Sequence, residues 1–246
     1  MGKIRLIPRL DIKGPNLIKS IQLEGLRVIG DPNIFAKKYY DEGADELIYM
    51  DAVASLYGRN SLKNLISKAV ENVFIPITVG GGIRTVDNAR EILRSGADKI
   101  AINTAAVNRP EIIKELVKEF GSQSIVISIE AKIISKNKWE VFVENGRQKT
   151  DLDVIDWAKK AEDFGIGEIL LTSIDREGTR KGFDIELIKK VQNLISIPLI
   201  ASGGMGSPKD LIEVVKQTGV KAVSMADAIH YDRYSLKEIK NAAISE

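Results

Sequence analysis

The sequence contains no cysteine and a single histidine, His230, among its 246 residues. The absence of cysteine excludes disulfides, zinc–thiolate sites and thiolate nucleophiles. Any proton transfer must therefore use aspartate, glutamate, lysine or arginine, because a lone histidine late in a chain is more often structural than catalytic. No cofactor and no metal are expected from this composition.

Positive and negative side chains are nearly balanced, since the net charge is +2. No basic tract carries interleaved aromatic residues, so nucleic acid is not an expected partner. No apolar run reaches the length of a membrane span, and residues 1–11 lack the apolar core of a signal peptide. We therefore expect a cytoplasmic protein with no membrane partner.

Short apolar runs rich in β-branched residues alternate with amphipathic helical stretches along the whole chain. The predicted strands are Arg5–Leu10, Glu46–Asp51, Ile77–Val79, Lys99–Ile102, Ile125–Glu130, Glu168–Thr172, Leu199–Ser202 and Ala222–Met225. Eight strands alternating with helices predict an α/β fold, a single (β/α)8 TIM barrel. The alternative is an open doubly wound sheet, but its GxGxxG motif is absent.

Two longer segments interrupt the alternation. Residues 13–30 are expected to form a loop after the first strand. Residues 133–149 are expected to form a small hairpin with turns at 136–138 and 145–146. Both segments would lie at the C-terminal face of the barrel, where segments of this length are candidate lids.

The chain also repeats itself in order. The matching segments are 74–84 with 196–206, 43–51 with 165–173, and 95–107 with 218–230. Three ordered matches predict one barrel domain built from two duplicated halves, about 1–122 and 123–246. A duplicated half-barrel favours the closed barrel over the open sheet.

Five motifs carry a resemblance to a known family. They are DEGADELIYMD, PITVGGGIR, GADKIAINTAAV, WAKKAEDFGIGEILLTSIDREGT and IPLIASGGMGS. With them the chain resembles, from end to end, the cyclase subunit of imidazole glycerol phosphate synthase, the HisF family of histidine biosynthesis. The resemblance implies a lyase that adds ammonia to a phosphorylated nucleotide intermediate and closes an imidazole ring. It also implies a separate HisH-like glutaminase partner, since a chain without cysteine cannot itself be a thiolate glutaminase.

The resemblance implies two phosphate sites, one in each half. Glycine turns let a backbone approach an anion closely, and short polar residues add donors. We name the two sets the first-half cradle, which comprises Gly81, Gly82, Asn103 and Thr104, and the second-half cradle, which comprises Gly203, Gly204, Ala226 and Asp227. Asp227 departs from the small hydroxyl residue of the family, and a carboxylate repels a phosphate dianion. We therefore expect an intact first cradle and an altered second one.

The resemblance assigns the chemistry to two carboxylates at strand ends, Asp11 and Glu130. Glu130 stands where the family has aspartate, so its carboxyl group is displaced by about one methylene, a shift that can matter for rate. Such a pair divides general acid and general base work when the two environments differ. Further substrate-binding candidates at strand ends and in loops are Lys19, Asp51, Thr172, Asp175, Gly178 and Ser202.

Charged residues mark the opposite end of the barrel. Arg5, Glu46, Lys99 and Glu168 stand at the starts of four strands and predict a salt-bridged ring. In the family this ring is the gate through which ammonia enters. Asp98 and Gln123 match positions at the glutaminase interface. Without the resemblance, the ring would be a structural ion network.

The inward row of the first strand is Arg5, Ile7, Arg9 and Asp11. Arg9 replaces a small uncharged residue of the family. A buried guanidinium must be paired, so we expect it to bind Asp11, Glu130 or a substrate anion.

Arg9, Glu130 and Asp227 are three departures at one end of the barrel, and together they favour an altered acceptor. The segment RLDIKGPN is more similar to relatives that accompany sugar amidotransferases in surface-polysaccharide pathways. Four hypotheses therefore stay open: the standard cyclase, ammonia relay to a sugar-amidating enzyme, an aldose–ketose isomerase of the related two-aspartate barrels, and a non-catalytic scaffold for a glutaminase.

Overall fold

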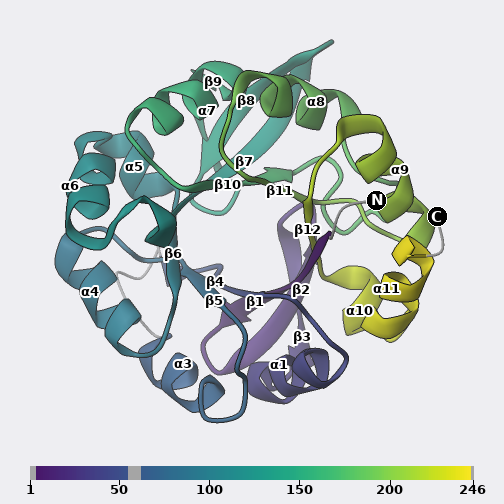
Figure 1. Cartoon of the computed structure of the whole chain (residues 1–246). Coiled ribbons are helices and arrows are strands. Elements are labelled where there is room, and N and C mark those ends of the chain that lie inside the picture. The colour runs from purple at the N-terminus through teal and green to yellow at the C-terminus, as the bar shows by residue number, and fades with distance from the viewer. Residues whose placement is uncertain (1–3, 55–61, 245–246) are drawn as a thin grey trace.

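The apolar runs predicted as strands form the wall of a closed barrel in the computed structural model, which describes residues 4–54 and 62–244. Eight parallel strands follow the order β10-β11-β12-β1-β4-β5-β6-β7, and pairing of β7 with β10 closes the ring (Figure 1). Their bounds are β1 Arg5–Lys13, β4 Leu47–Asp51, β5 Ile77–Gly80, β6 Lys99–Ile102, β7 Ile125–Ser135, β10 Glu168–Ser173, β11 Leu199–Ser202 and β12 Ala222–Met225. The predicted (β/α)8 barrel is confirmed, and its division into two half-barrels stays a prediction from the repeats.

Side-chain alternation along the strands separates two cores. Leu6 and Leu10 of β1 join the large core between the strands and the surrounding helices, whereas Ile7 joins a small core inside the barrel. The other members of the inner core are Ile48, Met50, Ala101, Val126, Leu170, Ile200 and Ala222. This inner layer separates the two polar ends of the barrel axis.

Helices surround the strands, as the amphipathic stretches predict (Figure 1). Their bounds are α1 Pro32–Asp41, α3 Lys63–Ala69, α4 Val86–Arg94, α5 Thr104–Asn108, α6 Glu111–Phe120, α7 Val154–Asp163, α8 Ile185–Leu194, α9 Pro208–Thr218, α10 Asp227–His230 and α11 Leu236–Ile244, with a 3₁₀ turn η1 at Ser122–Ser124. Local sequence sets several of the ends. The Thr85 hydroxyl accepts from the Asn88 N–H at the start of α4, and Asp153 caps α7 in the same way.

Two antiparallel hairpins extend the barrel sheet. The prediction of a loop at 13–30 is wrong, because β2 Asn16–Ile21 and β3 Glu24–Gly30 form a hairpin that pairs with the end of β1. The second hairpin is confirmed, with β7 running on to pair with β8 Lys138–Val143, which pairs with β9 Gln148–Asp153. Both hairpins lie at the C-terminal ends of barrel strands, next to the candidate site.

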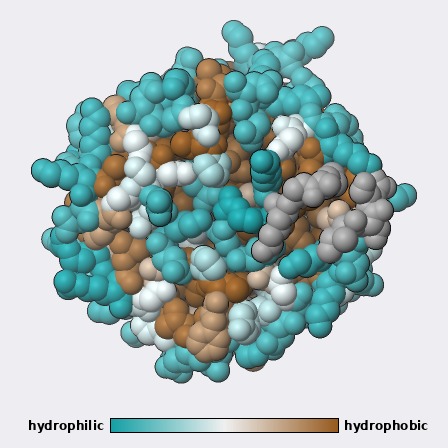
Figure 2. Space-filling view, in the orientation of Figure 1, coloured by the Kyte–Doolittle hydropathy of each residue, from teal (hydrophilic) through white to brown (hydrophobic). Residues whose placement is uncertain are grey.

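The surface has polar residues at the barrel axis. Figure 2, in the orientation of Figure 1, shows hydrophilic side chains gathered over the middle of the barrel with apolar ones around them. Within residues 4–54 and 62–244, no helix combines the length and the apolar character that a membrane span requires.

Candidate functional site

Arg9 is buried at the C-terminal end of the barrel interior, with 2% of its surface exposed. Its Nε donates to Asp11 Oδ1 at 2.8 Å, and its Nη1 donates to Thr172 Oγ1 of β10 at 3.0 Å. Burial alone would lower the pKa of Arg9, but the charges of Asp11, Glu177 and Glu130 raise it above its ordinary value. The guanidinium is therefore held charged, and the predicted pairing with Asp11 is confirmed.

Glu130 lies on β7, which is four strands away from β1 around the barrel. Glu130 is 6% exposed, and its Oε2 accepts a hydrogen bond from the Gly146 N–H at 2.8 Å. Burial raises the pKa of Glu130 to about 7, against the lowering effects of Arg9 and of the Gly146 bond. Near neutral pH this carboxyl group can therefore carry a proton, whereas Asp11 is tied to a permanent cation.

The first-half cradle borders an open cavity of about 290 Å³. Gly81 and Gly82 line it from the β5–α4 turn, and Asn103 and Thr104 line it from the end of β6. Gly81 has φ +97°, and a Cβ there would meet the Asp51 carbonyl oxygen at 2.5 Å, so only glycine fits this turn. The predicted residues of the first cradle therefore come together around one cavity.

The same cavity extends to the barrel mouth and the second hairpin. Asp51, Ser128 and Glu130 line its inner side, and Glu144 and Asn145 line its outer side. The Glu144 N–H donates to Thr104 Oγ1 at 3.2 Å, and Asn103 Nδ2 donates to the Phe142 carbonyl at 3.0 Å. The hairpin β8–β9 is thus docked directly on the donor residues of the first cradle.

The second-half cradle is nearly filled. The space among Gly203, Gly204, Ala226 and Asp227 amounts to about 10 Å³, and Arg9 and Glu177 border it together with Ser202 and Gly178. The two cradles therefore differ in free volume: the first offers a ligand-sized cavity and the second does not. Arg9 borders the second space from β1, two residues before Asp11, whereas the much smaller Ser128 lines the first cavity from β7, two residues before Glu130.

Lys19 is buried in the hairpin β2–β3 and forms an ion pair with Glu177, in the loop that follows β10. The charges of Glu177 and Asp11 raise the pKa of Lys19 despite its burial. Gly178 allows the close approach, because a Cβ there would meet the Ser20 carbonyl oxygen at 2.5 Å. The first hairpin is therefore fixed onto the second half of the barrel.

The tips of the two hairpins meet above the barrel. Leu23 is 4% exposed, and a Cβ added to Gly146 would meet its Cδ1 at 2.8 Å. The Gly146 N–H is the donor to Glu130. The contact between the hairpins therefore fixes the backbone group that binds the candidate acid.

Asp227 does not stand alone as a carboxylate facing the second cradle. Its Oδ1 lies 3.2 Å from Arg233 Nε and 3.7 Å from Arg180 Nε. Asp227 is 9% exposed, whereas the side chains of both arginines are 40% exposed or more. The repulsion expected from Asp227 is therefore countered by two cations that the motif comparison did not single out.

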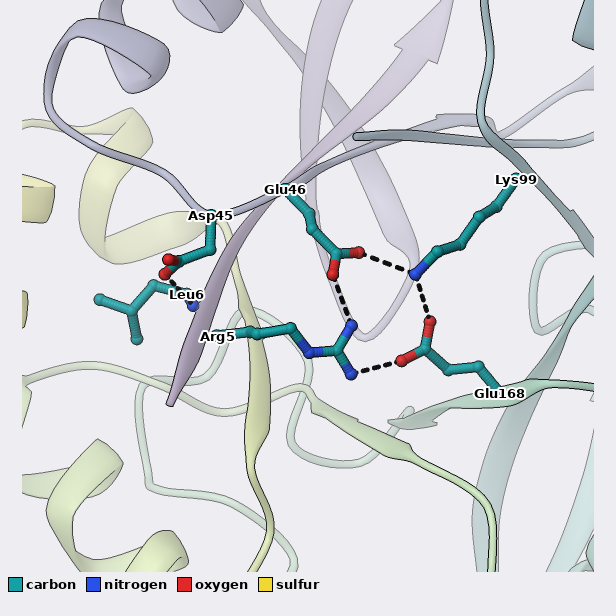
Figure 3. A network of polar contacts seen from close by, with 6 residues as sticks. All are labelled: Arg5, Leu6, Asp45, Glu46, Lys99 and Glu168. Atoms are coloured by element: carbon teal, nitrogen blue, oxygen red, sulfur yellow. Dashed lines mark hydrogen bonds and ion pairs between the residues drawn. The ribbon is translucent and has the colours of Figure 1, made fainter. Parts of the chain in front are cut away.

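At the opposite end of the barrel, Arg5, Glu46, Lys99 and Glu168 point toward one another and form the predicted ring (Figure 3). Arg5 Nη1 donates to Glu46 at 2.5 Å and its Nη2 donates to Glu168, while Lys99 Nζ donates to Glu46 at 3.1 Å and to Glu168 at 2.9 Å. Glu46 immediately precedes β4 instead of starting it. Bonds to Glu168 and Glu46 raise the pKa of Arg5 against the effect of its burial.

The surroundings of this ring are open. A cavity of about 640 Å³ touches Arg5, Lys99 and Glu168 and extends to Gln123. Asp98 and Gln123 are both exposed, and Asp98 Oδ2 also accepts the Ile77 N–H at 2.8 Å. Both predicted interface residues therefore lie at the face that carries the ring.

Known proteins are similar to this chain over most of its length. The family model "Histidine biosynthesis protein" matches residues 5–235. "Imidazole glycerol phosphate synthase subunit HisF" of Legionella pneumophila is 64% identical over 206 residues, covering 84% of this chain and 97% of that relative. The chain belongs to the HisF family. Its relatives of the same name include those of Prochlorococcus marinus (strain MIT 9215), 47% identical with 98% and 94% of the two chains covered, and of Methanopyrus kandleri, 45% identical with 96% and 93% covered.

The remaining residues predicted from the HisF motifs divide between site and scaffold. Thr172 binds Arg9, and Ser202 borders the second cradle. Asp51 lines the first cavity and accepts the Val53 N–H at 3.0 Å. Asp175 accepts the Ile133 N–H at 2.8 Å, which places it in the support of the second hairpin.

Motif comparison within the HisF family missed Glu177, Gly146, Arg180 and Arg233. Glu177 could not be found from local pattern, since its partner Lys19 lies 158 residues away in sequence. Gly146 was predicted only as a turn residue, because it binds Glu130 through its backbone N–H and not through a side chain. Arg233 follows Asp227 by six residues and could have been noticed as a nearby cation. Within the described ranges, no group of three or more histidine, aspartate and glutamate side chains could hold a metal ion.

Proposed function

We propose that the chain is the ammonia-using synthase and cyclase subunit of an imidazole glycerol phosphate synthase-type enzyme. The observation that supports this most is the arrangement along one axis. A charged ring stands at one end of the barrel, and two buried carboxyl groups next to a phosphate-type glycine turn stand at the other. HisF names at up to 64% identity agree with this assignment.

In this proposal Glu130 is the general acid and Asp11, paired with Arg9, is the second carboxyl group. Glu130 carries a proton near neutral pH because burial raises its pKa to about 7. Asp11, bound to Arg9, stays available to accept a proton or to stabilise positive charge. Two carboxyl groups in unlike environments are the arrangement that acid–base catalysis requires.

The first-half cradle would bind one phosphate of the substrate, with Gly81 and Gly82 offering backbone N–H groups and Asn103 and Thr104 offering side chains. Its cavity connects this turn to Glu130, which would bring the reacting end of a ligand to the acid. The proposed ammonia source is a HisH-like glutaminase docked at the face that carries the ring. A cytoplasmic location stays a prediction.

The test is turnover of the standard cyclase substrate by the purified chain with added ammonium at alkaline pH, where more of it is free ammonia. Turnover supports the proposal, and a dependence on Glu130 and Asp11 supports their roles. A second assay with glutamine and a HisH glutaminase tests the partner. A chain that turns over substrate with ammonium but never with glutamine would contradict the partner assignment.

A second candidate is relay of ammonia to a sugar-amidating enzyme with little cyclase activity. The observation that favours it is the filled second-half cradle, which leaves about 10 Å³ where a second phosphate would lie. Under this candidate the chain alone does not turn over the standard substrate. The triple variant Arg9→Cys, Glu130→Asp, Asp227→Ser would then gain activity. If the wild-type chain is as active as other HisF cyclases, this candidate is wrong.

A further inference from the structure

A second cavity lies on the rim of the barrel mouth, outside the second-half cradle. It measures about 470 Å³ and lies between the hairpin β2–β3, the loop after β10 and the segment after β12. Four basic and two acidic side chains line it: Lys19, Arg27, Arg180, Arg233, Glu24 and Asp227. Lys19 is already paired with Glu177. The free positive charge of the cavity therefore comes from the arginines.

Asp227 organises two of these arginines. Both approach its Oδ1 through Nε, at 3.2 Å for Arg233 and 3.7 Å for Arg180. Among residues 4–54 and 62–244, the polar contacts of both arginines with protein acceptors are made through Nε, and none is made through the terminal Nη atoms. A guanidinium held by Nε can direct its Nη groups at an oxyanion, and two such groups fit the oxygens of a phosphate.

Backbone and ring contacts fix where the two arginines stand. Arg180 adopts φ +58°, and a Cβ at Gly206 would meet the Arg180 Cβ at 2.6 Å, so the loop is pressed against that glycine. The Arg233 guanidinium lies over the Tyr231 ring, 5.3 Å from its centroid. One arginine would be enough to neutralise Asp227, and the second leaves a net positive charge facing the cavity.

We propose that Arg180 and Arg233, oriented by Asp227, bind a phosphate monoester dianion of the ligand at the rim of the second half. This site takes the place of the filled Gly203–Gly204 turn, so the ligand's second anionic group lies further out than the duplicated pattern predicts. The inference rests on the proposed function only in that the ligand is phosphorylated. It also gives Asp227 a positioning role instead of a repulsive one.

The test is calorimetric titration of the full chain with ribose 5-phosphate, with ribose as the uncharged control. The wild type is expected to bind two equivalents, one at the first-half cradle and one at the rim. Arg180→Gln and Arg233→Gln should each lower the affinity for one of the two equivalents roughly tenfold. The double variant should no longer bind that equivalent. Arg90→Gln is the matched control, because Arg90 is a paired surface arginine of α4 that lines no cavity named above.

The double Arg180→Lys, Arg233→Lys variant separates geometry from net charge. It keeps both positive charges but loses the planar guanidinium groups. The affinity for ribose 5-phosphate at the rim site should therefore fall less than in the double glutamine variant. If the double glutamine variant still binds two equivalents with wild-type affinity, or if the wild type binds one equivalent that the variant leaves unchanged, the rim site does not exist. Turnover with ammonium is measured separately, so loss of the rim site and failure of the proposed reaction are distinguishable.

Discussion

Replacing Arg9 with methionine tests how strongly the buried guanidinium stabilises the barrel mouth. Methionine keeps an unbranched, flexible but shorter side chain and removes the donors to Asp11 and Thr172. Asp11 is 4% exposed, so its carboxylate then stays buried without the Arg9 cation. Breaking a buried ion pair by removing one partner costs about 3–5 kcal/mol, so the free energy of unfolding should fall by that amount.

The carboxylate left behind causes most of this loss, and a second substitution can show it. Asp11→Asn removes the charge but keeps the shape, so the double variant Arg9→Met, Asp11→Asn should be more stable than the sum of the two single changes predicts. We expect a coupling energy of about 2–3 kcal/mol between the two positions. The loss of Arg9 should also raise the pKa of Glu130 further, because the Arg9 charge lowers it in the wild type.

The assay is equilibrium urea denaturation followed by circular dichroism and by fluorescence of the two buried tryptophans, Trp139 and Trp157, with coincident transitions required. Arg90→Met is the control for loss of a paired surface arginine and should leave the midpoint unchanged. If Arg9→Met destabilises by less than about 1 kcal/mol, or if Asp11→Asn fails to compensate, the reasoning about the buried pair is wrong.

Three further predictions concern the acid, the hairpin contact and the ring. The folded state holds an extra proton on Glu130 between its ordinary pKa of 4.5 and about 7, so stability falls as pH rises through that range, and Glu130→Gln should flatten this slope in urea midpoints. Gly146→Ala, at φ +76° and against Leu23, should destabilise by about 1–2 kcal/mol and shift the acid's pKa upward, read from the pH–rate profile. An unchanged urea midpoint for Gly146→Ala would contradict the close contact between Gly146 and Leu23. Lys99→Met should lower glutamine-driven turnover relative to ammonia-driven turnover, and equal losses in both would reject a gate.

The barrel could be predicted from the sequence because its signals are local. Each wall strand is a short apolar run, and each helix carries its apolar stripe and caps within a few residues, as Thr85 does for α4. The first hairpin could not be predicted in the same way. Its strand β2 buries Lys19, and a buried lysine becomes acceptable only when Glu177, 158 residues further on, supplies the countercharge.

Part of the site was predictable, because a buried charged side chain requires a partner of opposite charge. A guanidinium on the inward face of β1 must be paired, and Asp11, two residues away on the same face, is the nearest carboxylate. The difference in free volume between the two cradles was not predictable, because both share the same glycine pattern. The space left at the second cradle is bordered by Arg9 and Glu177, and free volume in a packed interior depends on side chains from several strands.

The three departures from the HisF pattern are physically linked through Arg9. Its side chain borders the second-half cradle, where about 10 Å³ remain, so a phosphate has no room against the Gly203–Gly204 turn. Asp227 can then carry its charge, since Arg180 and Arg233 compensate it. On the other side of the barrel, burial raises the pKa of Glu130, and the Arg9 charge and the Gly146 bond limit the rise to about 7. A change at Arg9 alone should therefore alter both the space for the ligand and the protonation of the acid, which is why these positions have to be tested together.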